Sequence, residues 1–127
     1  MADQQGLDSL ALAKKVAELA AEKKAEDIVI LDMTEAVSYT DYFVICSGNN
    51  ERQVKAIHDA VYEGLKHGAD HLAPNRVEGL QQSSWVLLDY LDVVVHIFMP
   101  ETRDFYRLDR LWGDVPEVKV ENQQGAV

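Results

Sequence analysis

The pattern of apolar and polar residues is clearest in residues 85–112, which read WVLLDYLDVVVHIFMPETRDFYRLDRLW. Two short apolar runs, Trp85–Leu88 and Val93–Met99, are separated by the polar-edged residues 89–92. Short runs that are rich in β-branched and aromatic residues and flanked by Asp are typical of the two strands of a hairpin. This segment therefore predicts a β-hairpin, and the rest of the chain is organised around it.

A helix is expected directly after the hairpin. Pro100 ends the second strand, because proline donates no ladder hydrogen bond and suits the first turn of a helix. Phe105, Leu108 and Leu111 or Trp112 then follow at helical spacing. Both pleat faces of the hairpin are apolar, so both need cover, and one of them is expected to lie open near the hairpin.

The same patterns predict the elements that precede the hairpin. The order is helix, strand, strand, helix and short strand, and it indicates a single α/β domain with a mixed sheet of about five strands and three helices. The domain is expected to span residues 1–116, and residues 117–127 form a polar tail that is expected to be disordered. The five elements are a helix from Ser9 to about Lys24, a strand at Asp27–Met33, a strand at Tyr42–Ser47, a helix from Asn50 to about Gly68 and an edge strand within Pro74–Gly79.

The charge balance changes the functional expectation. The chain has 127 residues and a formal net charge of -10, whereas nucleic-acid binders usually carry a basic patch. Residues 25–51 contain six Asp or Glu and no Lys or Arg. Such a surface would attract a basic partner, or it would simply keep the protein soluble. Both interpretations stay open.

Cysteine usage and the first residues point to a reducing, cytoplasmic setting. Cys46 is the only cysteine, so no disulfide framework exists. The first nine residues, MADQQGLDS, lack the basic and apolar regions of a signal peptide. No apolar stretch approaches the length of a membrane span.

The candidates for chemistry are weak. Asp89 and Asp92 could hold a divalent metal, but Asp is common beside hairpin turns because it caps the local backbone. Ser47 and Gly48, before the second helix, could seat a phosphate on free amides, although no Lys follows them. No Asp-x-Asp pair occurs anywhere, so we expect no enzyme activity, no metal site and no cofactor. Trp85 is either a core residue or an exposed anchor for a partner.

Three further motifs accompany the hairpin: DIVILD at residues 27–32, TDYFVICSGNNERQV at 40–54 and VEG at 77–79. Together with residues 85–112, they resemble the ribosomal silencing factors, the RsfS or Iojap family. The resemblance covers about residues 8 to 115. It implies a nucleotidyltransferase-like fold that lacks the catalytic carboxylates, in agreement with the missing Asp-x-Asp pair.

The resemblance also implies a function. Proteins of this family bind the fourteenth ribosomal protein of the large subunit and block joining of the small subunit, which represses translation under nutrient limitation. Organellar relatives serve ribosome assembly. Carried over by motif, the expected contact surface centres on Trp85, Asp89, Tyr90 and Asp92, with His96, Met99 and Tyr106 as further candidates.

Two alternatives remain beside this expectation: a divergent metal-dependent nucleotidyltransferase-like enzyme that uses Asp89 and Asp92, and an acidic homodimeric assembly adaptor. Contact with ribosomal RNA is a further open question. One position departs from the family, which usually has Gly where this chain has Leu91. Gly would permit a positive φ in a tight turn, whereas Leu would be strained there.

Overall fold

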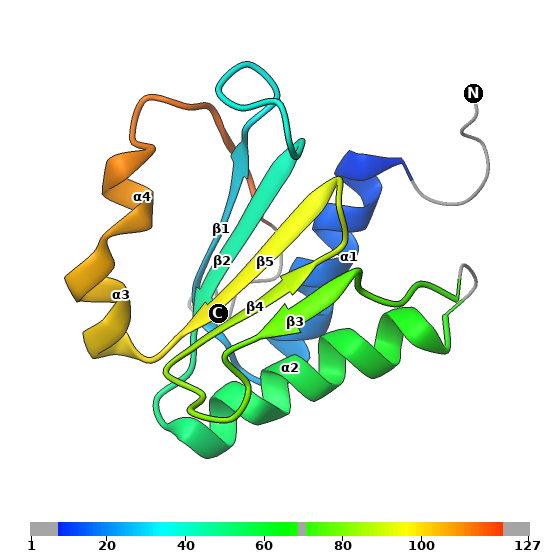
Figure 1. Ribbon diagram of the computed structural model, residues 1–127, viewed down its shortest axis with the longest axis vertical. Helices are drawn as coiled ribbons and strands as arrows, with labels where there is room; N and C mark the ends of the chain where they lie inside the picture. The colour runs from blue at the N-terminus through cyan, green and yellow to red at the C-terminus, as the bar shows by residue number, and fades with distance from the viewer. Residues whose placement is uncertain (1–7, 69–70, 121–127) are drawn as a thin grey trace.

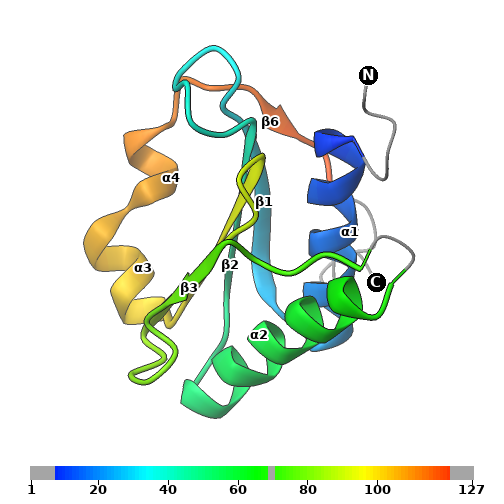
Figure 2. The same cartoon turned by 45° about the vertical axis from the view of Figure 1, so that its right-hand side comes forward.

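Six strands form one mixed sheet with helices on both of its faces (Figures 1 and 2). The computed structural model describes residues 8–68 and 71–120. Along the sheet the strand order is β3-β4-β5-β2-β1-β6. The elements are α1 (Ser9–Glu22), β1 (Glu26–Asp32), β2 (Tyr42–Ser47), α2 (Glu51–Lys66), β3 (Arg76–Glu78), β4 (Trp85–Asp89), β5 (Val93–Phe98), α3 (Pro100–Tyr106), α4 (Leu108–Leu111) and β6 (Glu117–Val118).

The predicted α/β class and the central hairpin are confirmed. Strands β4 and β5 pair antiparallel, and β5 pairs parallel with β2, which makes the sheet mixed. Strand β2 lies between β5 and β1, as its apolar run predicts. Figure 2 shows the three layers: α1 and α2 lie on one side of the sheet, and α3 and α4 lie on the other.

Capping side chains begin the two long helices where the sequence predicts. Asp8 Oδ1 accepts from the Ala11 amide at 2.7 Å, and Asn50 Oδ1 accepts from the Gln53 amide at 2.9 Å. The Gln53 side chain reaches back to the Asn49 amide at 2.7 Å, one residue earlier than in the usual capping box. Its Nε2 also donates to the Lys23 carbonyl at 3.1 Å, so it links the start of α2 to the end of α1.

The main core lies between the sheet and the α1–α2 layer. Gly64 on α2 allows the two helices to approach closely, because a Cβ there would lie 2.6 Å from Leu19 Cδ2 on α1. The largest fully buried side chains of this core come from α1, α2 and the sheet: Val16, Ile28, Ile30, Val44, Val54, Ile57, Val61, Leu88 and Ile97.

The carboxyl-terminal part differs from the prediction in two ways. The single helix expected after Pro100 is divided, because Arg107 adopts a left-handed conformation with φ 52° and its amide closes α3 on the Arg103 carbonyl at 2.7 Å. Glu117 and Val118 form β6 on the edge of β1, so the predicted tail does not begin at residue 117. Pairing there protects the outer edge of β1. Residues 121–127 of that tail lie outside the described residues.

Across the described ranges 8–68 and 71–120, no helix is long and apolar enough to cross a membrane.

Candidate partner-binding surface

The face of the sheet that carries α3 and α4 is covered unevenly. These helices pack Leu108 and Trp112 against a second buried cluster around Phe43 and Phe98. Towards the hairpin edge the cover thins, and Trp85 and Leu87 of β4 are only partly buried. The expectation of an incompletely covered apolar face near the hairpin is therefore confirmed.

Strand alternation decides which side chains share this face. On β4 these are Trp85, Leu87 and Asp89, and they pair in register with Phe98, His96 and Val94 of β5. Strand β3 adds two charged side chains at the sheet edge, opposite Asp89 and Leu87. We use the name hairpin surface for the outer residues of this face: Arg76, Glu78, Trp85, Leu87, Asp89 and Tyr106.

Trp85 lies at the centre of the hairpin surface. Its ring packs against Phe98, with ring centroids 4.9 Å apart, and against Tyr106 of α3, with ring centroids 4.8 Å apart. Its indole Nε1 donates to Nδ1 of His96 at 3.1 Å. Trp85 is half-buried, so one part of the ring belongs to the second cluster and the other part is accessible.

His96 lies beneath Trp85 and is only 5% exposed. Because its Nδ1 accepts from the indole, its proton sits on Nε2, which is buried without a hydrogen-bond partner among the described residues. Burial lowers the pKa of His96 to about 4, so the ring is neutral near pH 7. His96, which the sequence predicts as a contact residue, therefore lies beneath Trp85 and supports its ring.

The hairpin turn explains Asp89. Its Oδ1 accepts from the Leu91 amide at 2.8 Å, and its Oδ2 lies 3.5 Å from Arg76 Nε. Arg76 also pairs with Glu78, Nη1 to Oε2, at 3.0 Å. The turn-capping interpretation of Asp89 is thus confirmed, and both of its oxygens are engaged.

Leu91 adopts the conformation that the missing glycine would favour. Its φ is 73°, and the Asp92 amide donates to the Tyr90 carbonyl at 2.9 Å, which closes a three-residue γ-turn. The Leu91 side chain is 58% exposed, so packing does not compensate for this backbone. Asp92 lies exposed at the same tip.

Tyr90 and Met99 do not lie on the hairpin surface. Tyr90 is 8% exposed and belongs to the core under α1 and α2, and its hydroxyl has no partner among the described residues. Burial raises the pKa of that hydroxyl. Met99 packs on the same core. The sequence predicts that Tyr90 contacts a partner, and the structure places it on the face opposite to Trp85, because it continues the alternation of Val86 and Leu88.

The motif-based reasoning missed three residues of the surface, Leu87 on β4 and Arg76 and Glu78 on β3. Leu87 stands two residues after Trp85, so strand alternation could have placed it on the same face. Arg76 carries no local signal, because its position opposite Asp89 depends on how β3 pairs with β4. Tyr106, which the motif did suggest, is 50% exposed and packs against Trp85 with its ring tilted by 48°.

The described residues contain no group of three or more His, Cys, Asp or Glu that could hold a metal ion. Cys46 is fully buried, and burial raises the pKa of its thiol to about 12, so it is not poised as a nucleophile. The hairpin surface combines a central aromatic pair with a charged rim, a composition that is common in protein interfaces.

Comparison with known sequences identifies the family. The profile described as "Ribosomal silencing factor during starvation" matches residues 7–127. Ribosomal silencing factor RsfS of Halalkalibacterium halodurans is 44% identical over 101 residues, covering 79% of this chain and 84% of that protein. RsfS of Bacillus subtilis is 39% identical over 112 residues, covering 87% and 92%. This chain belongs to the ribosomal silencing factor family.

Solved structures and a more distant relative agree with this assignment. A crystal structure from Chromobacterium violaceum superposes with a TM-score of 0.80 at 30% identity, covering 95% of this chain and 100% of that one. The mouse protein named "Mitochondrial assembly of ribosomal large subunit protein 1" is 36% identical over 97 residues, which are 74% of this chain and 42% of that protein. The RsfS-family match spans the whole hairpin surface.

Proposed function

We propose that the protein represses translation by binding the large ribosomal subunit through its fourteenth ribosomal protein and sterically blocking the small subunit. The expected setting is the cytoplasm under nutrient limitation, with no cofactor and no catalytic step. Membership in the ribosomal silencing factor family supports the general role. The contact through one ribosomal protein and the block of subunit joining are our own inferences from the resemblance.

The observation that carries the proposal is the half-buried Trp85 at the centre of the hairpin surface. Trp is enriched among the residues that dominate binding energy, above all where it is central and surrounded by a rim that excludes water. Here Tyr106 and Phe98 pack against the ring and His96 accepts its indole N–H, so Trp85 is held in place before a partner arrives. Pre-organisation of this kind lowers the entropy cost of binding.

We therefore revise the expected contact set. Trp85, Leu87, Asp89 and Tyr106 form its centre, and Arg76 with Glu78 form its charged rim. Asp92 at the hairpin tip remains an outer candidate. His96 acts beneath the surface, while Tyr90 and Met99 serve the core on the other face.

Trp85→Ala tests the proposal. We expect a folded protein whose affinity for purified large subunits falls at least about 30-fold, because a central aromatic contributes about 2 kcal/mol or more. The variant should also lose its ability to block subunit joining. Cosedimentation with large subunits and the thermal midpoint should be measured on the same preparation.

Tyr62→Ala is the matched control, because Tyr62 is a partly buried aromatic on α2, on the opposite face. It should bind normally. Truncating a tryptophan that belongs to the core would lower the free energy of unfolding by about 3–5 kcal/mol. If Trp85→Ala unfolds, or if it binds like the control, Trp85 is not the anchor.

A role in assembly of the large subunit is a second candidate, and the name of the mouse relative favours it. The two functions differ in which particle is bound. An assembly factor should associate with precursor large subunits and leave joining of mature subunits unchanged. A silencing factor should bind mature subunits and inhibit their joining.

Size-exclusion chromatography of the free protein would establish whether it is also a homodimer.

A further inference from the structure

A cleft of about 460 Å³ lies away from the hairpin surface, at the end of the sheet where β2 and β5 finish. These two strands are parallel, and Ser47 at the end of β2 pairs with Phe98 at the end of β5. Ligands of α/β proteins bind outside the carboxyl ends of parallel strands. The volume falls within the range of about 300–1,000 Å³ that is usual for small-molecule sites.

One wall of the cleft is basic. It contains Arg103, Arg107 and Arg110, which come from α3, the link after it and α4, and one acidic residue, Asp104 of α3. Three of the twelve Lys and Arg residues of an acidic chain thus meet at one place. Arg103 Nη1 donates to Oγ of the buried Ser47 at 2.9 Å, which anchors this wall to the end of β2.

The other two arginines are available to a ligand. Arg107 uses Nε to bind the Asp104 carbonyl of its own helix at 3.0 Å. Within the part of the chain that the structure describes, the salt bridges involve neither Arg107 nor Arg110. A guanidinium presents a planar fork of donors that fits phosphate oxygens in pairs.

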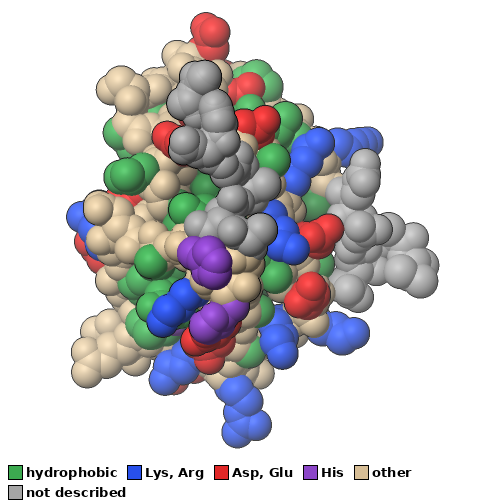
Figure 3. Space-filling view, turned by 90° about the vertical axis from the view of Figure 1, so that its right-hand side faces the viewer, with side chains coloured by type: hydrophobic (Ala, Val, Ile, Leu, Met, Phe, Trp, Pro, Cys, Tyr) green, Lys and Arg blue, Asp and Glu red, His purple; other side chains and the backbone are tan. Residues whose placement is uncertain are grey.

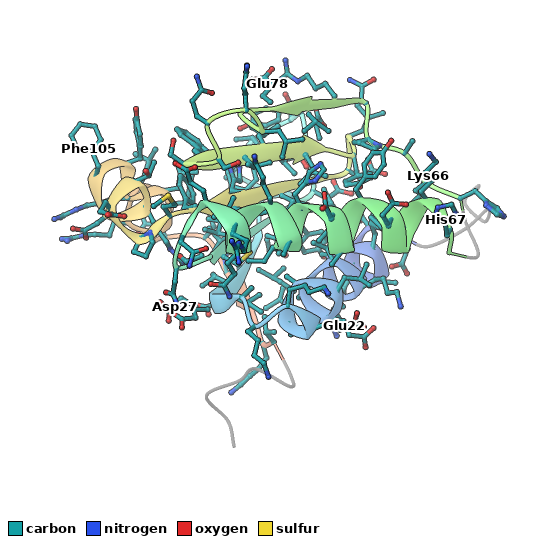
Figure 4. All side chains as sticks on the ribbon, turned by 90° about the horizontal axis from the view of Figure 1, so that it is seen from below. Glu22, Asp27, Lys66, His67, Glu78 and Phe105 are labelled. Atoms are coloured by element: carbon teal, nitrogen blue, oxygen red, sulfur yellow. The ribbon has the colours of Figure 1, made fainter. Side chains whose placement is uncertain are left out.

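A second wall of the cleft is acidic. Glu26 and Asp27 lie at the start of β1, where the pairing with β2 is irregular and Asp27 has φ 51°. Figure 4 shows Asp27 towards the end of the molecule that carries α3 and Phe105. Carboxylates repel a bare anion, but they accept hydrogen bonds from hydroxyl groups, as acidic residues do from ribose in dinucleotide-binding folds.

We propose that this cleft binds a nucleotide, with its phosphates on Arg107 and Arg110 and its ribose hydroxyls on the Asp27 side. The two walls favour one ligand that carries both an anionic group and hydroxyl donors. An extended RNA backbone also carries ribose 2′-hydroxyls, but it would bring phosphates along with them to the acidic wall. This site is separate from the hairpin surface, so the proposal does not depend on the ribosomal function.

Thermal unfolding and calorimetric titration with ATP, GTP and AMP, without divalent metals, test the proposal. Adenosine, guanosine and inorganic phosphate serve as comparison ligands. Nucleotides at millimolar concentration should raise the thermal midpoint, because a ligand that binds only the folded state stabilises it. The nucleosides should have no effect. Arg107→Gln with Arg110→Gln should weaken nucleotide binding at least about tenfold, since charge-assisted hydrogen bonds are lost.

Arg76→Gln is the matched control, because Arg76 is an exposed arginine on β3 that pairs with Glu78 and Asp89. It should bind nucleotide normally. Asp27→Asn gives a second readout, since Asn tolerates the left-handed backbone at this position. It should weaken nucleotide binding, and it should strengthen binding of inorganic phosphate by removing a repulsive charge.

Four results would overturn the proposal. They are no midpoint change with any nucleotide, full binding by the double arginine variant, equal effects of Asp27→Asn on nucleotide and phosphate, and binding of RNA oligonucleotides without binding of mononucleotides. Cosedimentation of the double arginine variant with large subunits should stay normal. A loss there would tie the cleft to the ribosome instead.

Discussion

At the residue scale, the tryptophan of the hairpin surface depends on a buried histidine. His96 can accept the indole hydrogen bond only while its Nδ1 is unprotonated. Burial keeps it so by lowering its pKa to about 4. The surrounding rings of Phe43 and Phe98, with centroids 4.8 and 6.1 Å from that of His96, offer no countercharge. Protonation should therefore both destabilise the fold and release Trp85.

We predict an acid-dependent loss of stability from this histidine. An unfolded histidine has a pKa near 6.5, so between about pH 6.5 and 4 the unfolded chain binds a proton that the folded protein does not. The free energy of unfolding should fall as the pH falls through this window, by up to about 3 kcal/mol. Urea unfolding from pH 7 to 4.5 would measure it.

In His96→Gln this part of the pH dependence should vanish. His67→Gln changes an exposed histidine that is paired with Glu63. In this variant the slope of the unfolding free energy against pH should remain close to that of the parent protein. A slope in His96→Gln that equals the parent slope would mean that His96 is not buried in its neutral form.

Leu91 gives a second prediction at the residue scale. Its positive φ raises the free energy of the folded protein by roughly 1–2 kcal/mol, because the residue has a Cβ. Replacement by glycine removes this strain, but part of the stabilisation is lost because glycine has more conformational freedom in the unfolded chain. Leu91→Gly should thus stabilise the protein by roughly 1 kcal/mol, measured by urea unfolding. Leu91→Ala keeps the Cβ and should bring no such gain. Equal effects of the two variants would exclude backbone strain as the cause.

At the scale of elements, the connection from β3 to β4 is built around Gly79. Its φ is 82°, and a Cβ there would clash with the Trp85 carbonyl oxygen. Ser83, in the same connection, is buried, and its amide donates to the Gly79 carbonyl at 2.8 Å. Gly79 of the VEG motif therefore allows the backbone of this connection to approach Trp85 closely.

We predict that Gly79→Ala destabilises the protein by more than about 1 kcal/mol and weakens large-subunit binding as well. Gly79→Asn separates the two causes, because Asn tolerates a positive φ but still places a Cβ against the Trp85 carbonyl. Both variants should be destabilised to a similar degree. Recovery of stability in Gly79→Asn would identify φ strain, and not the steric clash, as the reason for glycine.

At the scale of the whole molecule, acidic and basic side chains are distributed unevenly. The face formed by α1 and α2 shows Lys, Arg, Asp and Glu intermixed among its described residues (Figure 3). The stretch 25–51, which lacks Lys and Arg, instead covers β1, β2 and the loop between them. Arg103 of α3 and Arg110 of α4 meet at the cleft beside the ends of β2 and β5, where we propose that a nucleotide binds. The net charge of -10 thus includes local regions that differ in charge.

We predict that association with the large subunit is partly electrostatic, with this protein as the acidic member. Raising the ionic strength to physiological values shortens the screening length to about 8 Å, so the association rate should fall measurably while dissociation changes less. Stopped-flow or surface-based kinetics over a salt series would measure this. An association rate that is indifferent to salt would leave the acidic stretch with a role in solubility alone.

The sequence by itself determined the local features of this protein. Period-2 and helical patterns located the hairpin, the two capped helices and the edge strand, because each depends on neighbours within a few residues. The Leu91 turn was also predictable, since an Asp cap and a non-glycine residue at a tight turn are local facts. The combination of motifs indicated the family for the same reason.

Only the tertiary structure decided which groups meet. Alternation separates Trp85 from Tyr90, but it does not say which face the long helices cover, so the burial of Tyr90 required the packed fold. The parallel pairing of β2 with β5 unites Ser47 with Arg103, which lies 56 residues later. These contacts depend on strand order and helix placement, which are set by the burial of the whole core. They therefore cannot be predicted from the residues of one segment.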